Sequence, residues 1–142
     1  MAVTLDTFKR ELKTWLASKP GILSTLGDRP RVYYLRAPAR VEEPYVTWRL
    51  WAEGHHHLTG VSLIESPVVT FDVYGQDEGA VGAAAAALDE ALDGFRGLMG
   101  QVNVRTVQRQ SWQTIGEPRA AGTDDTVAHE RLDYAVWMAR SS

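Results

Sequence analysis

The sequence predicts an α+β fold, in which a mostly antiparallel sheet of about four to five strands carries its helices on one face. Helical periodicity marks an N-terminal and a long central segment, and strand-like segments lie on both sides of the central one, three before it and two after it. The chain has 142 residues, of which 44% are hydrophobic, and it lacks an internal repeat or linker. We therefore expect a single domain, 1–142, with its own core.

Two amphipathic segments predict the helices. In residues 3–18, apolar residues recur at three- and four-residue spacing opposite charged ones, and Pro20 ends the segment. A short apolar piece over 22–26 has the length of one helical turn. The central helix is expected over 77–95, where acidic residues stand near the start and five consecutive alanines favour a helix that packs closely on a sheet.

The strands are expected where apolar and β-branched residues alternate with polar ones. These segments are 31–36, 45–52, 68–75, 101–115 and 127–139. The first two flank the loop APARVEEP, which suggests sequential antiparallel pairing. In the last segment, one face is expected to hold Leu132, Tyr134, Val136 and Met138, and the other His129, Arg131, Asp133 and Trp137.

Composition excludes several classes of protein. The chain contains no cysteine, so it has no disulfides, thiolate zinc sites or cysteine nucleophiles. No apolar run approaches the roughly 18 residues of a membrane span, and the start does not resemble a signal peptide, so we expect a soluble, untargeted chain. The net charge is −3 with scattered Lys and Arg, which argues against tight nucleic-acid binding.

The segment WAEGHHHLTG, residues 51–60, holds three of the four histidines. On a strand, His55 and His57 would share one side, and a further metal ligand would have to come from Glu53 or His129. This spacing is not a zinc signature, because ligands usually converge from positions such as four residues apart on a helix. We favour a solvated turn; a metal site and a contact surface that titrates near neutral pH are the alternatives.

Other catalytic patterns are equally weak. Asp72 and Asp133 lie on separate strands, and salt-bridged or solvated carboxylates are the default interpretation. No Gly-x-Ser-x-Gly elbow occurs. Gly75, Gly79 and Gly82 follow a strand and open a helix, but the first interval is one residue too long for a dinucleotide-binding turn, so helix entry and packing explain them better. We expect no catalytic, metal or cofactor site.

The order of these segments resembles the tail-completion, or tail-terminator, proteins of long-tailed bacteriophages, also called tail-to-head joining proteins. The resemblance runs from about residue 5 to 138, through RVYYLRAPARVEEPYVTWRLW, SPVVTFDVYGQDEGAVGAAAAALDEALDGF and HERLDYAVWM. Its most telling parts are EPYVTW at 43–48 and the strand-to-helix passage at 69–94. The connection that bears the three histidines matches no feature of the family.

The resemblance implies a virion structural protein and not an enzyme. Such a protein is made in the cytoplasm of the host bacterium, assembles as a homo-oligomeric ring, commonly a hexamer, and lies in the virion tail at the head–tail junction. Its implied partners are the tail tube protein, whose growth it ends, and the head–tail connector protein. DNA passes through the ring without specific binding, which suits a mildly acidic chain; no cofactor and no membrane are implied.

Two polar loops rich in turn formers, 54–65 and 116–127, are the expected docking segments of such a ring. The contact residues expected there are His55, His56, His57, Leu58, Arg119, Thr123, Asp124 and Asp125. Two other classes of function stay open at this point. A small metal-dependent enzyme would use His55 to His57, and a monomeric binding module would use exposed aromatic residues.

Overall fold

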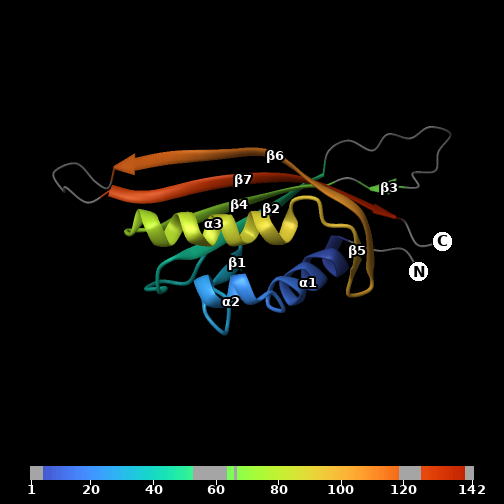
Figure 1. Cartoon of the computed structure of the whole chain (residues 1–142), viewed down its shortest axis with the longest axis horizontal. Helices are drawn as coiled ribbons and strands as arrows, with labels where there is room; N and C mark the ends of the chain where they lie inside the picture. Colours follow the sequence, from blue (N-terminus) through green and yellow to red (C-terminus); the bar gives the residue numbers. More distant parts are fainter. Residues whose placement is uncertain (1–4, 53–63, 66, 119–125, 140–142) are drawn as a thin grey trace.

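The structure, a computed structural model, describes residues 5–52, 64–65, 67–118 and 126–139 (Figure 1). The helices are α1 Leu5–Leu16, α2 Pro20–Leu26 and α3 Glu78–Leu92. The strands are β1 Val32–Tyr34, β2 Tyr45–Ala52, β3 Ile64–Glu65, β4 Pro67–Gly75, β5 Gly97–Met99, β6 Val102–Pro118 and β7 Thr126–Ala139. All helices and longer strands predicted from the sequence are present, within a few residues of their expected ends.

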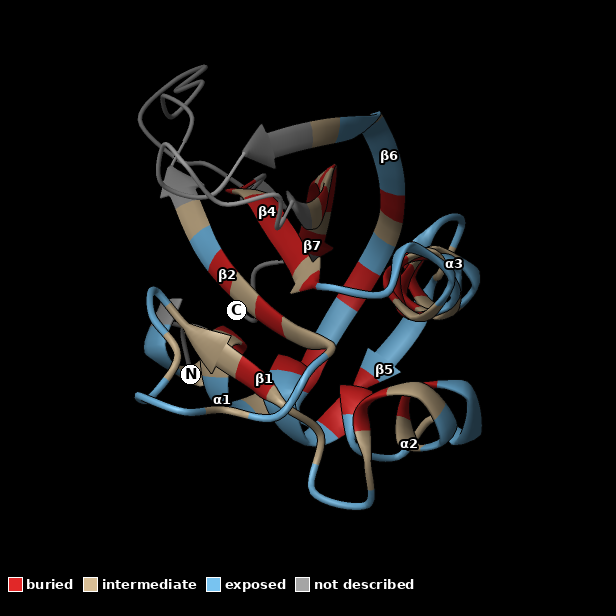
Figure 2. Cartoon of the chain, turned by 90° about the vertical axis from the view of Figure 1, so that its left-hand side faces the viewer, coloured by how far each residue is buried: buried red, intermediate tan, exposed pale blue. Residues whose placement is uncertain are grey.

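One mixed sheet forms the body of the molecule. In the described ranges it has seven strands in the order β1-β2-β4-β7-β6-β5, and β3 pairs with β7. The central strands β2, β4, β7 and β6 are antiparallel, and the helices cover one face of the curled sheet (Figures 1 and 2). The mixed arrangement of helices on one face of a sheet agrees with the predicted α+β class, but the sheet has more strands than the predicted four to five, and one of its strand pairs is parallel.

The predicted antiparallel pairing of the first two strands is also wrong, because β1 and β2 run parallel, with Val32 opposite Val46. The connection over 35–44 is long enough to carry the chain back to the start of β1 before β2 begins. Main-chain bonds fix this return, since the N–H of Leu35 donates to the Trp48 carbonyl at 2.9 Å and the N–H of Val46 donates to the Arg31 carbonyl at 2.8 Å. Proximity in sequence suggested a hairpin, which needs a much shorter loop.

The two missed strands are short. β3 has two residues and β5 three, too few for a period of two to stand out from a loop. β5 begins at Gly97, and the positive φ angles of Gly94 and Gly97, 81° and 135°, turn the chain after α3. Both expected docking loops are shorter than predicted, because β3 occupies the end of 54–65, and β6 and β7 pair as far as Pro118 and Thr126.

The core lies between the helices and the covered face of the sheet. α1 contributes Phe8 and Leu12, and α3 contributes Ala84, Ala85 and Leu88, each with at most 1% of its surface exposed. The small alanines bring α3 close to the strands, as expected from the sequence. On the sheet, the core residues include Val46, Trp48, Val69, Phe71, Val73, Leu132, Tyr134, Val136 and Met138. None of the helices in the described ranges has the length and apolar character that a membrane crossing needs.

Candidate functional site

The helix-free face of the sheet is polar, and its polar residues Thr70, Asp72 and His129 are buried. Because side chains alternate along a strand, the core positions Val69, Phe71 and Val73 of β4 place Thr70 and Asp72 on the opposite face. Thr70 is 1% exposed and Asp72 is 7% exposed. The neighbouring strand β7 places Arg131 opposite Asp72 and Asp133 opposite Thr70, which confirms the predicted division of β7 between two faces. This face is the candidate functional site.

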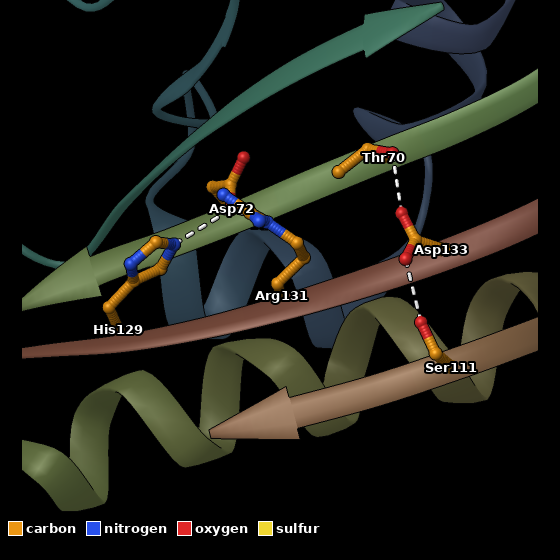
Figure 3. A network of polar contacts seen from close by, with 6 residues as sticks. All are labelled: Thr70, Asp72, Ser111, His129, Arg131 and Asp133. Carbon is orange, nitrogen blue, oxygen red and sulfur yellow. Dashed lines mark hydrogen bonds and ion pairs between the residues drawn. The ribbon is translucent and has the colours of Figure 1, made fainter. Parts of the chain in front are cut away.

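The Asp72 carboxylate contacts two side chains of β7, His129 and Arg131 (Figure 3). His129 Nε2 lies 2.7 Å from Asp72 Oδ1, and Arg131 Nε donates to the same oxygen at 2.8 Å. The ring of Tyr74 stacks on the His129 imidazole at 4.2 Å between centroids. The hydrogen bond that Arg131 donates to Asp72 raises the pKa of Arg131 above its usual value, so this guanidinium stays a cation beside the carboxylate.

Asp133 organises a second group on the same face (Figure 3). Its two carboxylate oxygens accept hydrogen bonds from the hydroxyls of Thr70 and Ser111, which come from the strands on either side. Asp72 and Asp133 therefore do not form the paired carboxylates of a general acid and base, because each has its own set of donors. Asp72 is salt-bridged to Arg131, as the default interpretation expects, whereas Asp133 is bonded to two hydroxyl groups.

The arrangement stabilises the sheet and lacks the relay of a hydrolase. Ser111 donates to Asp133 instead of His129, and the imidazole is only 1% exposed, so a substrate cannot reach it. The described residues also contain no group of three or more side chains that could hold a metal ion. Satisfied polar groups on a buried sheet surface fix the strand register, because a slip would leave each of them without a partner.

A cleft adjoins this network, under the connection between β1 and β2. Its inner part, about 270 Å³, is lined by Leu35, Thr47 and Arg49 together with Asp72, Tyr74 and Arg131. Its outer part, about 470 Å³, adds Arg36, Arg40 and Glu43. Leu35 is 64% exposed and has a φ angle of 71°, a conformation that is unusual for a leucine and marks this connection as a specific structure.

The turn at the start of α3 is a helix entry, as predicted. The Asp77 carboxylate caps the helix by accepting the N–H groups of Gly79 and Ala80 at 2.9 and 3.3 Å. A Cβ atom on Gly75 would lie 2.9 Å from Val81 Cγ2, so this glycine permits close contact between β4 and α3. These contacts give Gly75 and Gly79 a role in helix entry and packing.

The contact residues predicted from the sequence lie outside the described residues. They are His55, His56, His57, Leu58, Arg119, Thr123, Asp124 and Asp125. Of the candidate metal ligands, Glu53 also lies outside, whereas His129 is bonded to Asp72. Sequence reasoning missed the cleft and the Asp72 network. Their signal was the alternation of polar residues in 70–74 and 129–133, whose pairing depends on the strand register.

Tyr134 gives the fold a testable dependence on alkaline pH. Burial and the hydrogen bond that its hydroxyl donates to Asp89 at 2.9 Å raise the pKa of Tyr134 far above its usual value of 10.0. Above pH 10 the unfolded chain loses this proton and the folded chain keeps it. The free energy of unfolding should therefore fall as the pH rises above 10, with a contribution of up to about 1.4 kcal/mol per pH unit.

The variant Tyr134→Phe should lose this contribution. Urea unfolding between pH 7 and 12 should give parallel curves for the two proteins below about pH 9 and a shallower alkaline decline for the variant. Equal alkaline slopes would contradict the buried, protonated hydroxyl.

Comparisons with known proteins give a fold and no family. No model of a known protein family matches the chain, and no curated protein matches it. Among solved structures, the chain is similar to a chain of the structure described as "Virion of native gene transfer agent (GTA) particle". The TM-score is 0.62 and the identity 16%, and the match covers 91% of this chain and 90% of that chain. At this identity the likeness establishes that the two chains share a fold.

Proposed function

We propose that the chain is a virion structural protein of a tailed bacteriophage that caps the tail tube as a ring and joins it to the head connector. The observation that carries the proposal is the shared fold with a gene transfer agent virion chain over nine-tenths of both chains. The sequence resemblance to tail-completion proteins supports the same class independently of the structure. The proposed location is the virion, at the head–tail junction.

The chemistry of the described residues supports a structural role. The buried carboxylates have hydrogen-bond partners within the sheet, and the His129 imidazole is closed to solvent. Such a network makes a rigid body, which a ring subunit needs so that its contacts repeat identically around the ring. We propose that the loops 54–65 and 116–127, which contain the eight predicted contact residues, dock on the tail tube and the connector, and that the ring is a hexamer.

A tube-growth assay tests the capping role. Tail tube subunits of the same phage are polymerised with and without the chain, and tube lengths are measured by electron microscopy. We expect substoichiometric amounts of the chain to stop elongation and to appear as a ring at one end of each tube. Tubes that grow to the same length with an excess of the chain, and that carry no bound protein, would contradict the proposal.

A further inference from the structure

The cleft beside the Asp72 network carries an excess of positive charge. Four arginines line it, Arg36, Arg40, Arg49 and Arg131, against two carboxylates, Glu43 and Asp72. Both carboxylates already accept hydrogen bonds, Asp72 from β7 and Glu43 from the N–H of Gln76 at 2.9 Å. The exposed side chains of Arg36 and Arg40 have no polar partner within the described part of the chain. The cleft is therefore suited to an anionic group.

The cleft is preformed, because bonds fix the connection 35–44 near both ends. Leu35 is bonded to Trp48 through its N–H, and Arg31 Nε donates to the Pro44 carbonyl at 2.8 Å. The bond from its Nε to Asp72 fixes the position of Arg131. Its two terminal nitrogens make no bond to the residues described, so they remain available to a carboxylate, which guanidinium groups bind with directional hydrogen bonds.

The last turn of α3 has the opposite charge. It holds Asp89, Glu90 and Asp93 and no basic residue. Asp89 is bonded to Arg109 and Tyr134, and Asp93 accepts the Arg109 N–H. Glu90 is exposed and has no side-chain partner among the residues described. A carboxylate at the negative end of a helix dipole is unfavourable, so a cation supplied from outside the subunit would stabilise it.

The surface around Glu90 allows a close neighbour. Gly79, Ala83 and Ala86 are exposed and lie on the same stripe of α3 as Glu90, at helical spacing. Their small side chains do not hold another chain away from the helix. Figure 2 shows α3 at the right-hand side of the molecule and the connection that follows β1 at the left, so the two surfaces lie on different sides of one subunit.

We propose that the arginine cleft binds the Glu90 carboxylate of an adjacent copy of the chain, so that cleft and helix form the head-to-tail contact of the ring. The inference rests on the proposed function, because a ring requires contact between two different surfaces of each subunit. We favour a carboxylate of another copy over a DNA phosphate, because the chain carries a net charge of −3, which disfavours binding to a duplex.

Charge reversal tests the contact. The double variant Arg36→Glu/Arg40→Glu and the single variant Glu90→Arg should each weaken self-association on the order of tenfold or more, measured by light scattering across a concentration series. Each reversed surface then meets a like charge on an identical neighbour. Mixed in equal amounts, the two variants should assemble again, because alternating copies pair every Glu-bearing cleft with an Arg-bearing helix and every wild-type cleft with Glu90.

Control variants reverse single charges of the same signs elsewhere on the surface. Lys13→Glu and Asp28→Arg alter exposed residues of α1 and of the turn after α2, and both should assemble as the wild type does. If the wild type and every charge-reversal variant form the same ring, the contact is overturned and the proposed function stands. If the wild-type chain stays monomeric even with tail tube subunits, both the contact and the proposed function are contradicted. Binding of a DNA duplex that is lost in the cleft variant, with assembly intact, would assign the cleft to phosphate and overturn the inference.

Discussion

Replacing Phe71 with alanine should lower the free energy of unfolding by about 4 kcal/mol, the largest loss expected from any single change in the core. Phe71 is fully buried in β4, and its ring lies between Trp48 and Tyr134, at centroid distances of 6.3 and 5.9 Å. These neighbours come from the strands on either side, so they cannot close the cavity without moving the sheet. Chemical denaturation followed by tryptophan fluorescence measures the loss.

Leu98→Ala is the control for the loss of apolar side-chain volume. Leu98 is 70% exposed in the edge strand β5, so its truncation should change the free energy of unfolding by less than about 0.5 kcal/mol. A loss below about 1 kcal/mol for Phe71→Ala would mean that β4 does not run through the centre of the core.

Replacing Asp72 with alanine should lower the free energy of unfolding by about 3 kcal/mol, because His129 and Arg131 then lose the oxygen that they share. The cost falls mainly on His129, whose side chain is 1% exposed and cannot be hydrated, whereas the Arg131 side chain is 35% exposed and remains open to water. The same denaturation experiment measures it, together with the double variant Asp72→Ala/His129→Ala. If Asp72 and His129 stabilise the fold through their bond, the double variant should lose clearly less free energy of unfolding than the sum of the losses of the two single variants.

Asp28→Ala removes a carboxylate from an exposed turn and should leave the stability within about 0.5 kcal/mol of the wild type. Additive losses at Asp72 and His129 would contradict the buried bond between them. They would also weaken the view that this face is a rigid support for the cleft.

Periodicity predicts the elements of this fold better than it predicts their pairing. The segment 45–52 is the observed strand β2, and the expected central helix contains α3. Each of these elements can be recognised from a short segment of sequence, because burial of one face imposes a period of two residues on a strand and 3.6 residues on a helix. The direction of β1 is not a local property, so the prediction of an antiparallel pair failed although both strands were found.

The polar network escaped sequence reasoning for the same reason. His129 and Asp72 are 57 positions apart, and Thr70 and Asp133 are 63 apart. Each is an ordinary polar residue in an alternating strand until the β4–β7 register brings them together. The run of three histidines is visible in the sequence because its members are adjacent, whereas the described polar clusters form only when strands pair.

Mass by light scattering across a concentration series, with and without a chelator and with tail tube subunits added, tests the central claim most directly. We expect a ring, with a mass about six times the 15.8 kDa of one chain, that a chelator does not dissociate. A chain that remains monomeric under every condition would contradict the ring, and an assembly that a chelator dissociates would return His55, His56 and His57 to consideration as metal ligands.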